Sequence, residues 1–333
     1  MTKKLATTLF CASLLVLLPR LAGAQDAPLP TPGFHHLHLN SVDPEREIAF
    51  YTKNFKTTER AMFDGKPALK ALNVWILFNK VSAPAALKPQ TAIWHYGWNV
   101  PDERAYLANY QAMGTKLLPL WTGDGDNFVY VSSDSWPGAG GTLGRTKEQI
   151  AEAKAQDIKP RGGAGFGYLG GPDGEMIEFA GNFPTEYFNH VHMYQDEPLC
   201  AVLWYQKHLN APVRRGRGNA PPPTEANCKV PRTAEKSWVS LEKDGMYRAP
   251  GGGVSFGGVA LNWYINPGDT PLVSTLGHQA DHIALSVTDL DAWHAKLKAE
   301  GVTILKEPYK FADTRAFMIE GPSKEAIELV EVK

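Results

Sequence analysis

Hydrophobic and polar residues follow the same order at four places along the chain. At each place a short run of alternating side-chain type is followed by a turn with Asp and Pro or Asp and Glu. About a dozen residues with helical apolar spacing then follow. In AWHAKLKAEGVTIL the helix is expected to end at Gly301, because glycine suits a left-handed helix cap. The runs ALNVWILF and GGVALNWYI read as later strands. The pattern predicts an α+β fold in which a unit of strand, helix and several strands is used four times.

Constant offsets between similar segments divide the chain into two modules. FHHLHLNSVDPEREIAFYTKNF aligns without gaps with FNHVHMYQDEPLCAVLWYQKHL, 154 positions further on. WHYGWNVPDERAYLANYQAMGTKLL aligns with DHIALSVTDLDAWHAKLKAEGVTIL at an offset of 187, and GPDGEMIEF with GPSKEAIEL at 150. The modules are expected at 25–183 and 184–333, with insertions at about 121–165 in the first and about 210–242 in the second. Insertions of this length are typical of long loops or lids.

The first 24 residues have the composition of a secretory signal peptide. Two lysines precede an apolar run from Leu5 to Leu18, and Ala22-Gly23-Ala24 suits a cleavage site near Ala24. The run is shorter than the roughly 20 residues that span a bilayer. We therefore expect a secreted or periplasmic protein that has no membrane partner after cleavage.

Composition and cysteine content limit the possible partners of the chain and the compartments that suit it. With 43% hydrophobic and 21% charged residues the chain can bury substantial cores, and a formal net charge of -1 gives no electrostatic case for binding nucleic acid. Beyond the signal peptide, Cys200 and Cys228 remain. An oxidising compartment would permit them to pair, while one buried and one exposed thiol is an equally good interpretation.

Histidines at one equivalent strand position carry the candidate chemistry. They are His36, His95, His190 and His282. A core imidazole must satisfy two ring nitrogens, which a metal ion does naturally. Strand alternation puts the second histidine of each His-X-His pair, His38 and His192, on the same face. Two glutamates lie on apolar final strands, where a free carboxylate is costly to bury: Glu178 and Glu328. Two histidines and one carboxylate leave coordination positions open for substrate or oxygen.

These residues, and GPDGEMIEF with its likeness to the pattern DPDGxxIE, give the chain a family resemblance. It resembles the glyoxalase, bleomycin-resistance and extradiol-dioxygenase superfamily, or vicinal oxygen chelate (VOC) superfamily, over essentially the whole chain after the signal peptide. The resemblance implies paired βαβββ units that form an open mixed β-barrel in each module. It implies two ligand sets for a divalent ion (Fe, Mn, Zn, Ni or Co): His36, His95 and Glu178, and His190, His282 and Glu328. Whether each module closes its own barrel or the modules exchange halves is left open.

Departures from subfamily patterns narrow the expected reaction. Glyoxalase I enzymes add a glutamate on the last strand of the first unit, and ALNVWILFNK has no acid. Tyr168 stands at the tyrosine position of the extradiol dioxygenases, but no histidine lies between Arg161 and Tyr168, and Met318 takes that position in the second module. We expect a metal-dependent glyoxalase-like enzyme with lyase or isomerase chemistry on a small oxygen-chelating molecule. The candidate catalytic groups are His38, His192, Glu175 and Tyr168.

Two other functions remain open at this stage. One is an Fe(II) extradiol-type ring-cleaving dioxygenase, which would need iron. The other is a non-catalytic protein that binds or sequesters a small molecule, as in the bleomycin-resistance branch. Six intact candidate ligands favour an enzyme, although a chain with one active and one degenerate module is also compatible. The expected partner is a small-molecule substrate, and the chain is expected to be a monomer or a homodimer.

Overall fold

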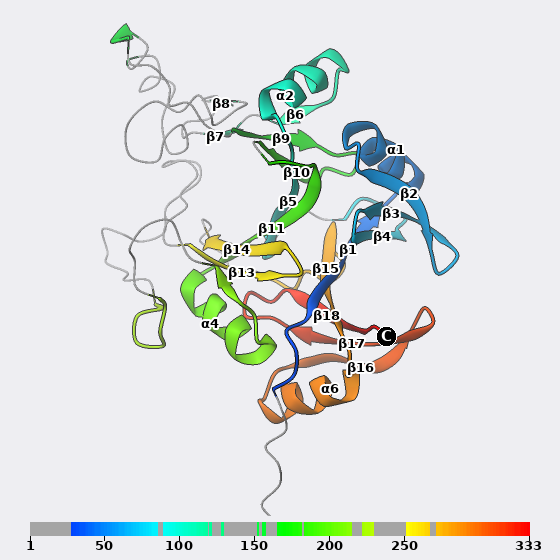
Figure 1. Cartoon of the computed structure of the whole chain (residues 1–333), viewed down its shortest axis with the longest axis vertical. Coiled ribbons are helices and arrows are strands. Elements are labelled where there is room, and N and C mark those ends of the chain that lie inside the picture. The colour runs from blue at the N-terminus through cyan, green and yellow to red at the C-terminus, as the bar shows by residue number, and fades with distance from the viewer. Residues whose placement is uncertain are drawn as a thin grey trace, which may run out of the picture.

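The computed structural model of the chain (Figure 1) describes most of residues 28–333. The described ranges are 28–85, 89–118, 120–121, 128–129, 152, 155–157, 165–181, 183–214, 222–229, 251–266 and 271–333. The predicted signal peptide, 1–24, and most of both predicted insertions, about 121–165 and about 210–242, lie outside them. In the described part no helix is long and apolar enough to cross a membrane.

The four predicted units are present, and they confirm the α+β class. Unit 1 contains β1 (Gly33–Ser41), α1 (Pro44–Asn54), β2 (Thr58–Phe63), β3 (Lys66–Ala71) and β4 (Val74–Lys80). Unit 2 contains β5 (Ile93–Asn99), α2 (Glu103–Ala112), β6 (Leu117–Leu118), β9 (Phe166–Gly170) and β10 (Met176–Ala180), with a separate pair, β7 (Leu120–Trp121) and β8 (Phe128–Val129).

The second half of the chain repeats this order. Unit 3 contains β11 (Tyr187–Gln195), α4 (Pro198–Leu209), β12 (Val213–Arg214), β13 (Gly252–Phe256) and β14 (Val259–Ile265). Unit 4 contains β15 (Ala280–Val287), α6 (Leu290–Ala299), β16 (Ile304–Phe311), β17 (Thr314–Glu320) and β18 (Ala326–Glu331). Figure 1 shows α2 and α6 near opposite ends of the molecule, with the sheets between them.

Aspartates in the predicted turns start three of the helices. The side chains of Asp43, Asp102 and Asp289 accept hydrogen bonds from backbone N–H groups three residues later, at 2.9 to 3.3 Å. Such bonds satisfy amide groups that a first helical turn leaves without partners. Gly301 has φ 75° just after α6, as expected for a glycine that ends a helix.

The strands form two eight-stranded sheets, and each sheet takes one unit from each module. The terminal sheet joins units 1 and 4 in the order β16-β17-β18-β15-β1-β4-β3-β2. The central sheet joins units 2 and 3 in the order β12-β13-β14-β11-β5-β10-β9-β6. Within each sheet the two units meet through an antiparallel pair, β1 with β15 and β5 with β11, while the strands that flank these pairs run parallel to them. The modules have exchanged halves.

This arrangement corrects the domain division. Residues 25–183 and 184–333 remain the limits of the sequence repeat, but neither range forms a sheet of its own. The offsets reveal which segments are alike, whereas strand pairing depends on contacts between distant segments. The sheets are mixed and have edge strands, as an open barrel requires. In the terminal sheet Phe63 of β2 and Phe311 of β16 pack at 5.5 Å between ring centroids, so the two edges approach each other.

Consecutive units still contact each other, through one continuous core between the sheets. Tyr51 of α1 and Tyr96 of β5 share a hydrogen bond of 2.7 Å between their hydroxyl groups. Tyr205 of α4 donates to Glu325, in the turn before β18, at 2.7 Å. The helix of each odd-numbered unit therefore reaches the unit that follows it in sequence.

The repeated Gly-Pro-X-X-Glu segment is a turn built around its glutamate. Glu175 accepts a hydrogen bond from the N–H of Asp173 at 3.0 Å, and Glu325 accepts one from Ser323 at 2.7 Å. A Cβ atom on Gly171 would lie 1.9 Å from an oxygen of Glu175. This part of the repeat is therefore explained by turn geometry, because only glycine leaves room for the returning carboxylate.

A disulfide joins Cys200, near the start of α4, to Cys228. The two cysteines left open by the sequence are thus paired in the structure.

Candidate metal centres

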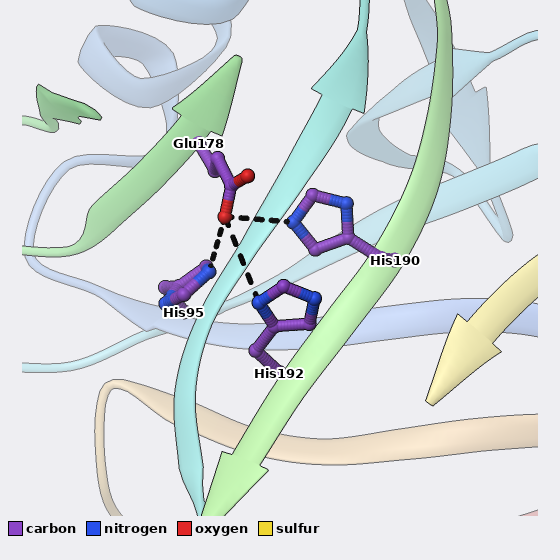
Figure 2. Close-up of side chains that lie close together, drawn as sticks. All are labelled: His95, Glu178, His190 and His192. Carbon is purple, nitrogen blue, oxygen red and sulfur yellow. Dashed lines mark hydrogen bonds and ion pairs between the residues drawn. The ribbon is translucent and has the colours of Figure 1, made fainter. Parts of the chain in front are cut away.

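Site 1 lies in the central sheet and contains His95 of β5, Glu178 of β10, and His190 and His192 of β11. Figure 2 shows the three imidazoles converging on the Glu178 carboxylate. Its Oε2 atom lies 2.7 Å from His95 Nε2, 3.4 Å from His190 Nε2 and 3.6 Å from His192 Nδ1. One donor atom from each residue lies within 4.8 Å of all the others, and all four side chains are buried.

Glycine makes the crowding in site 1 possible. Gly97 of β5 stands between the ligand strands, in register with His190 on one side and Glu178 on the other. A Cβ atom there would lie 2.7 Å from His190 Cε1 and 2.8 Å from Glu178 Cβ. The absence of a side chain at this position lets the imidazole and the carboxylate approach each other.

Site 2 is the equivalent place in the terminal sheet. His36 and His38 of β1 and His282 of β15 have donor atoms within 4.8 Å of one another. Glu328 of β18 lies beside them, with its Oε2 atom 3.3 Å from His36 Nε2 and 3.9 Å from His282 Nε2. The other oxygen of Glu328 accepts a hydrogen bond from Tyr309 of β16. Site 2 is therefore a cluster of three histidines with a carboxylate at its margin.

Each of the four equivalent histidines directly follows an extra residue in its strand. The ladders β1–β15 and β5–β11 shift register at these positions, where one residue has no opposite partner: His35, Trp94, Asn189 and Asp281. Such β-bulges change the direction in which neighbouring side chains point.

Three of the bulge residues hydrogen-bond to the next imidazole. Asp281 Oδ1 lies 2.6 Å from His282 Nδ1, His35 Nδ1 lies 2.8 Å from His36 Nδ1, and Asn189 bonds to His190 Nδ1. Trp94 instead packs edge-on against His95, with ring centroids 4.2 Å apart. In His36, His190 and His282 the Nε2 atom is left to face the cluster, as is usual for metal-binding histidines.

The pKa values of the two glutamates are shifted in opposite directions. Burial raises the pKa of the Glu178 carboxyl, but His190 and His95 beside it outweigh burial and hold that pKa well below its usual value. In site 2 burial keeps the pKa of Glu328 above its usual value, and His282 and Tyr309 only partly offset this effect. The carboxylate of site 1 is thus the better prepared of the two to bind a cation.

Two histidines of site 2, His36 and His38, are held neutral. Burial, followed by the neighbouring histidines, lowers the pKa of His36 well below its ordinary value. Burial and then His282 lower the pKa of His38 to about 3. Neutral imidazoles keep a lone pair for a metal ion.

Both clusters fit a divalent transition metal by their chemistry. Within the described part of the chain, several buried atoms of the clusters make no hydrogen bond: Nε2 of His36, His190 and His282, and Oε2 of Glu328. Unsatisfied buried groups are rare in proteins, and coordination to a metal would satisfy them. Imidazole nitrogen and carboxylate oxygen are ligands that suit zinc, iron, nickel and copper, so the donor set does not select one ion.

The structure brings the six predicted ligands together in different sets from those expected. His36 does not meet His95 and Glu178, because these residues lie in different sheets. The sets found are His95, Glu178 and His190 in site 1, and His36, His282 and Glu328 in site 2. The correction follows from the exchanged halves: each site takes its two strand histidines from different modules.

Three of the four predicted catalytic residues lie in or beside the clusters, and the fourth lies in a turn. His38 and His192 lie within the clusters, where each offers a donor atom, and Tyr168 packs edge-on against His95 at 5.0 Å between ring centroids. Glu175 belongs to neither cluster among the described residues. It lies in the turn described above, and it shares a cavity of about 290 Å³ with His95, Trp94 and Tyr194. Its proposed part in proton transfer stays a prediction.

Sequence reasoning missed Tyr309 and the bulge residues Asn189 and Asp281. Tyr309 lies on a strand whose equivalent in unit 2 falls near the insertion, so the repeat gives no match for it. The only local signal for Asn189 and Asp281 is a polar side chain directly before a repeated histidine.

Comparison with known proteins agrees with the fold. Residues 187–329 match the family described as Glyoxalase/Bleomycin resistance protein/Dioxygenase superfamily. The fold is similar to that of glyoxalase I from Zea mays, at 14% sequence identity over 90% of this chain and 92% of that chain, with a TM-score of 0.59. It is also similar to a "putative dioxygenase" from Bacillus subtilis subsp. subtilis str. 168, at 9% identity over 90% of this chain and 85% of that chain, with a TM-score of 0.52. No curated protein sequence matches the chain.

Fold and sites together define a protein of four βαβββ-type units with a buried histidine and glutamate cluster in each of two mixed sheets. Residues 187–329 match the Glyoxalase/Bleomycin resistance protein/Dioxygenase superfamily, in agreement with the sequence resemblance, and the chain has the fold of glyoxalase I over 90% of its length.

Proposed function

We propose that the protein is a metal-dependent enzyme that acts on a small molecule with two neighbouring oxygen atoms, by lyase or isomerase chemistry. The observation that carries this proposal is the convergence of three imidazoles and one carboxylate in site 1. Burial of all four side chains makes their convergence costly unless a cation compensates for it.

Named residues have separate parts in this proposal. His95, His190 and Glu178 would hold the ion, which when bound supplies Lewis-acid polarisation of the substrate oxygens. His192 would either be a fourth ligand or move a proton, since its ring lies 4.5 Å from that of His95 and 5.0 Å from that of Tyr264. Tyr168, edge-on to His95, would orient a bound oxygen group.

Elemental analysis of the purified protein tests the proposal. We expect up to two divalent ions per chain, one lost in His95→Ala and the other in His282→Ala, because these variants remove a ligand from different sites. His294→Ala is the matched control, since His294 pairs with Glu307 at 2.7 Å outside both clusters. A protein that binds no transition metal would exclude the enzyme proposal.

A second candidate is an Fe(II)-dependent ring-cleaving dioxygenase. Tyr168 favours it, because this tyrosine lies beside His95 and in register with Glu178. Oxygen uptake by the iron-loaded protein with a catechol would support this candidate, whereas turnover with redox-inert zinc would support the first. A binding protein without catalysis would hold metal and ligand and convert neither.

We also propose that the protein acts outside the cytoplasm, after cleavage near Ala24. The Cys200–Cys228 disulfide supports export, because such bonds persist in oxidising compartments. N-terminal sequencing of the mature protein tests the cleavage site, and sedimentation decides between a monomer and a homodimer.

A further inference from the structure

Each site lies in a row of residues that crosses its sheet in register, and the two rows differ in charge at their ends. A row of side chains in register crosses the terminal sheet through site 2: Lys70, Trp75, His36, Ala284, Glu328, Met318 and Lys306. The equivalent row crosses the central sheet through site 1: Ser255, Ala260, His190, Gly97, Glu178, Tyr168 and Leu118. Residues in register share one face of a sheet. The row of site 2 begins and ends with a lysine, whereas that of site 1 begins with serine and ends with leucine.

Lys66, Lys70 and Lys306 together form what we call the lysine triad. Lys66 and Lys70 lie four residues apart on β3, so their side chains share one face of the sheet. Lys306 lies on β16. Lys70 Nζ lies 4.2 Å from the centre of the Trp75 ring, and Lys306 Nζ lies 3.7 Å from that of Tyr309, which bonds to Glu328. Both ammonium groups are thus held over rings that adjoin site 2.

Aromatic side chains connect the lysine triad to the cluster. Phe311 stacks on His36 with ring centroids 5.6 Å apart and an angle of 1° between the planes. Phe63 packs against Phe311 at 5.5 Å and against Trp75 at 5.1 Å. These three rings are half-buried, and His38 is also partly exposed, whereas every member of site 1 is buried. Site 2 therefore offers apolar, planar walls with cationic groups at their edge.

Two acidic residues near the lysine triad, Asp281 and Glu59, make no ion pair with it in the described chain. Asp281 is engaged by His282, by Asn40 at 2.9 Å and by the N–H of Gly277 at 2.7 Å. Glu59 faces Lys70 across the β2–β3 ladder, and no ion pair joins the two in the described chain.

We propose that site 2 binds an anionic planar ligand: its neighbouring oxygens face His36 and His282, and its carboxylate lies against the lysine triad. Site 1 takes a ligand of the same oxygen chemistry without that charge. This inference rests on the proposed metal-dependent function, and it assigns different substrate classes to the two sites of one chain.

A pair of probes of matched shape tests the charge preference. 3,4-Dihydroxybenzoate and 3,4-dihydroxybenzamide present the same two oxygens, and only the benzoate is charged. Calorimetric titration would use the zinc-loaded full chain with His95→Ala, which leaves site 2, and with His282→Ala, which leaves site 1. We expect the benzoate to bind site 2 roughly tenfold or more tightly than the benzamide, and site 1 to show no such preference.

Lysine variants connect the preference to its cause. In the His95→Ala background, Lys70→Met with Lys306→Met should abolish the preference for benzoate, because the methionines keep the length of the side chains and lose the charge. Lys80→Met is the matched control, since Lys80 lies at the end of β4 on the opposite face from Trp75.

The outcomes separate this inference from the proposed function. Equal binding of the two probes at site 2, or an undiminished preference in the lysine variant, overturns the inference even when the protein binds zinc. A protein that binds no metal overturns the proposed function. The titration is then repeated without metal: a preference for benzoate that depends on Lys70 and Lys306 still supports the anion site, and its absence overturns that too.

Discussion

Single residues decide how closely the ligands of each site can approach. Gly97 in site 1 and Ala284 in site 2 hold the same place in their rows, between a histidine and a glutamate. The Nε2-to-Oε2 distance is 3.4 Å across Gly97 and 3.3 Å across Ala284. A Cβ atom at Gly97 would lie 2.8 Å from Glu178 Cβ, so the central sheet has no room for the alanine that the terminal sheet holds. The surrounding backbone, and not the ligands alone, therefore differs between the two sites.

Gly97→Ala should weaken metal binding at site 1 and leave site 2 unchanged. The new Cβ atom would lie 2.5 Å from the backbone oxygen of Glu178, so the ligand strands must separate. Overpacking of this kind typically costs about 1–3 kcal/mol, and we expect roughly a tenfold loss of zinc affinity or more. Competition titration with a chelator in the His282→Ala background measures it. Ala284→Gly, measured in the His95→Ala background as the control, should retain the metal of site 2; an unchanged affinity in Gly97→Ala would contradict the prediction.

The repeat marks equivalent positions, and the residues at these positions meet in the two clusters. The offsets relate His95 to the other strand histidines, the resemblance implies Glu178 as a ligand, and both residues lie in site 1. The bulges that aim the histidines carry no comparable pattern, since His35, Trp94, Asn189 and Asp281 are four different residue types. A residue with no opposite partner in a ladder becomes visible only when the two strands are seen together.

At the scale of elements, the turn before each final strand connects helix and sheet. The turn that holds Glu325 packs on α4 through Tyr205. Full burial, only partly offset by that hydrogen bond, raises the pKa of Glu325 to about 7. The folded protein therefore binds this proton more tightly than an unfolded chain does.

Glu325 should make the protein less stable as pH rises from about 4.5 to about 7. In this window the folded state retains a proton that the unfolded state has released, so the free energy of unfolding falls as pH increases. The largest contribution is about 3 kcal/mol, from a shift of about 2.5 pKa units (7 less 4.5). Urea unfolding at pH 5 and pH 7.5 measures it, with Glu325→Gln as a variant that cannot ionise. A variant with the same pH dependence as the parent protein would show that other groups cause it.

At the scale of the whole molecule, each sheet is shared between the two halves of the chain. Sequence alone could establish the four units because their patterns are local. It could not establish which units pair, because β1 meets β15 across more than two hundred residues. The assignment of His36 and His95 to one site failed for this reason and not because either residue was misread.

Neither half of the chain should form a metal site alone. Residues 25–183 contain His95 and Glu178 but not His190, and they contain His36 but not His282. Produced separately, 25–183 and 184–333 should bind no stoichiometric zinc; produced together, they should recover both sites. Size-exclusion chromatography with elemental analysis of the complex decides this. Full metal binding by either half on its own would refute the exchanged arrangement.

The pairing of the units also places both insertions in one sheet. The insertion in unit 2 leaves after β6 and returns at β9, and that in unit 3 leaves after β12 and returns at β13. All four strands belong to the central sheet, although the insertions lie in different halves of the sequence. Units 1 and 4, which form the terminal sheet, have no insertion of comparable length in the sequence. One polypeptide thus carries the site twice, once in a sheet with two insertions and once in a sheet without them, so site 2 provides an internal reference for variants of site 1.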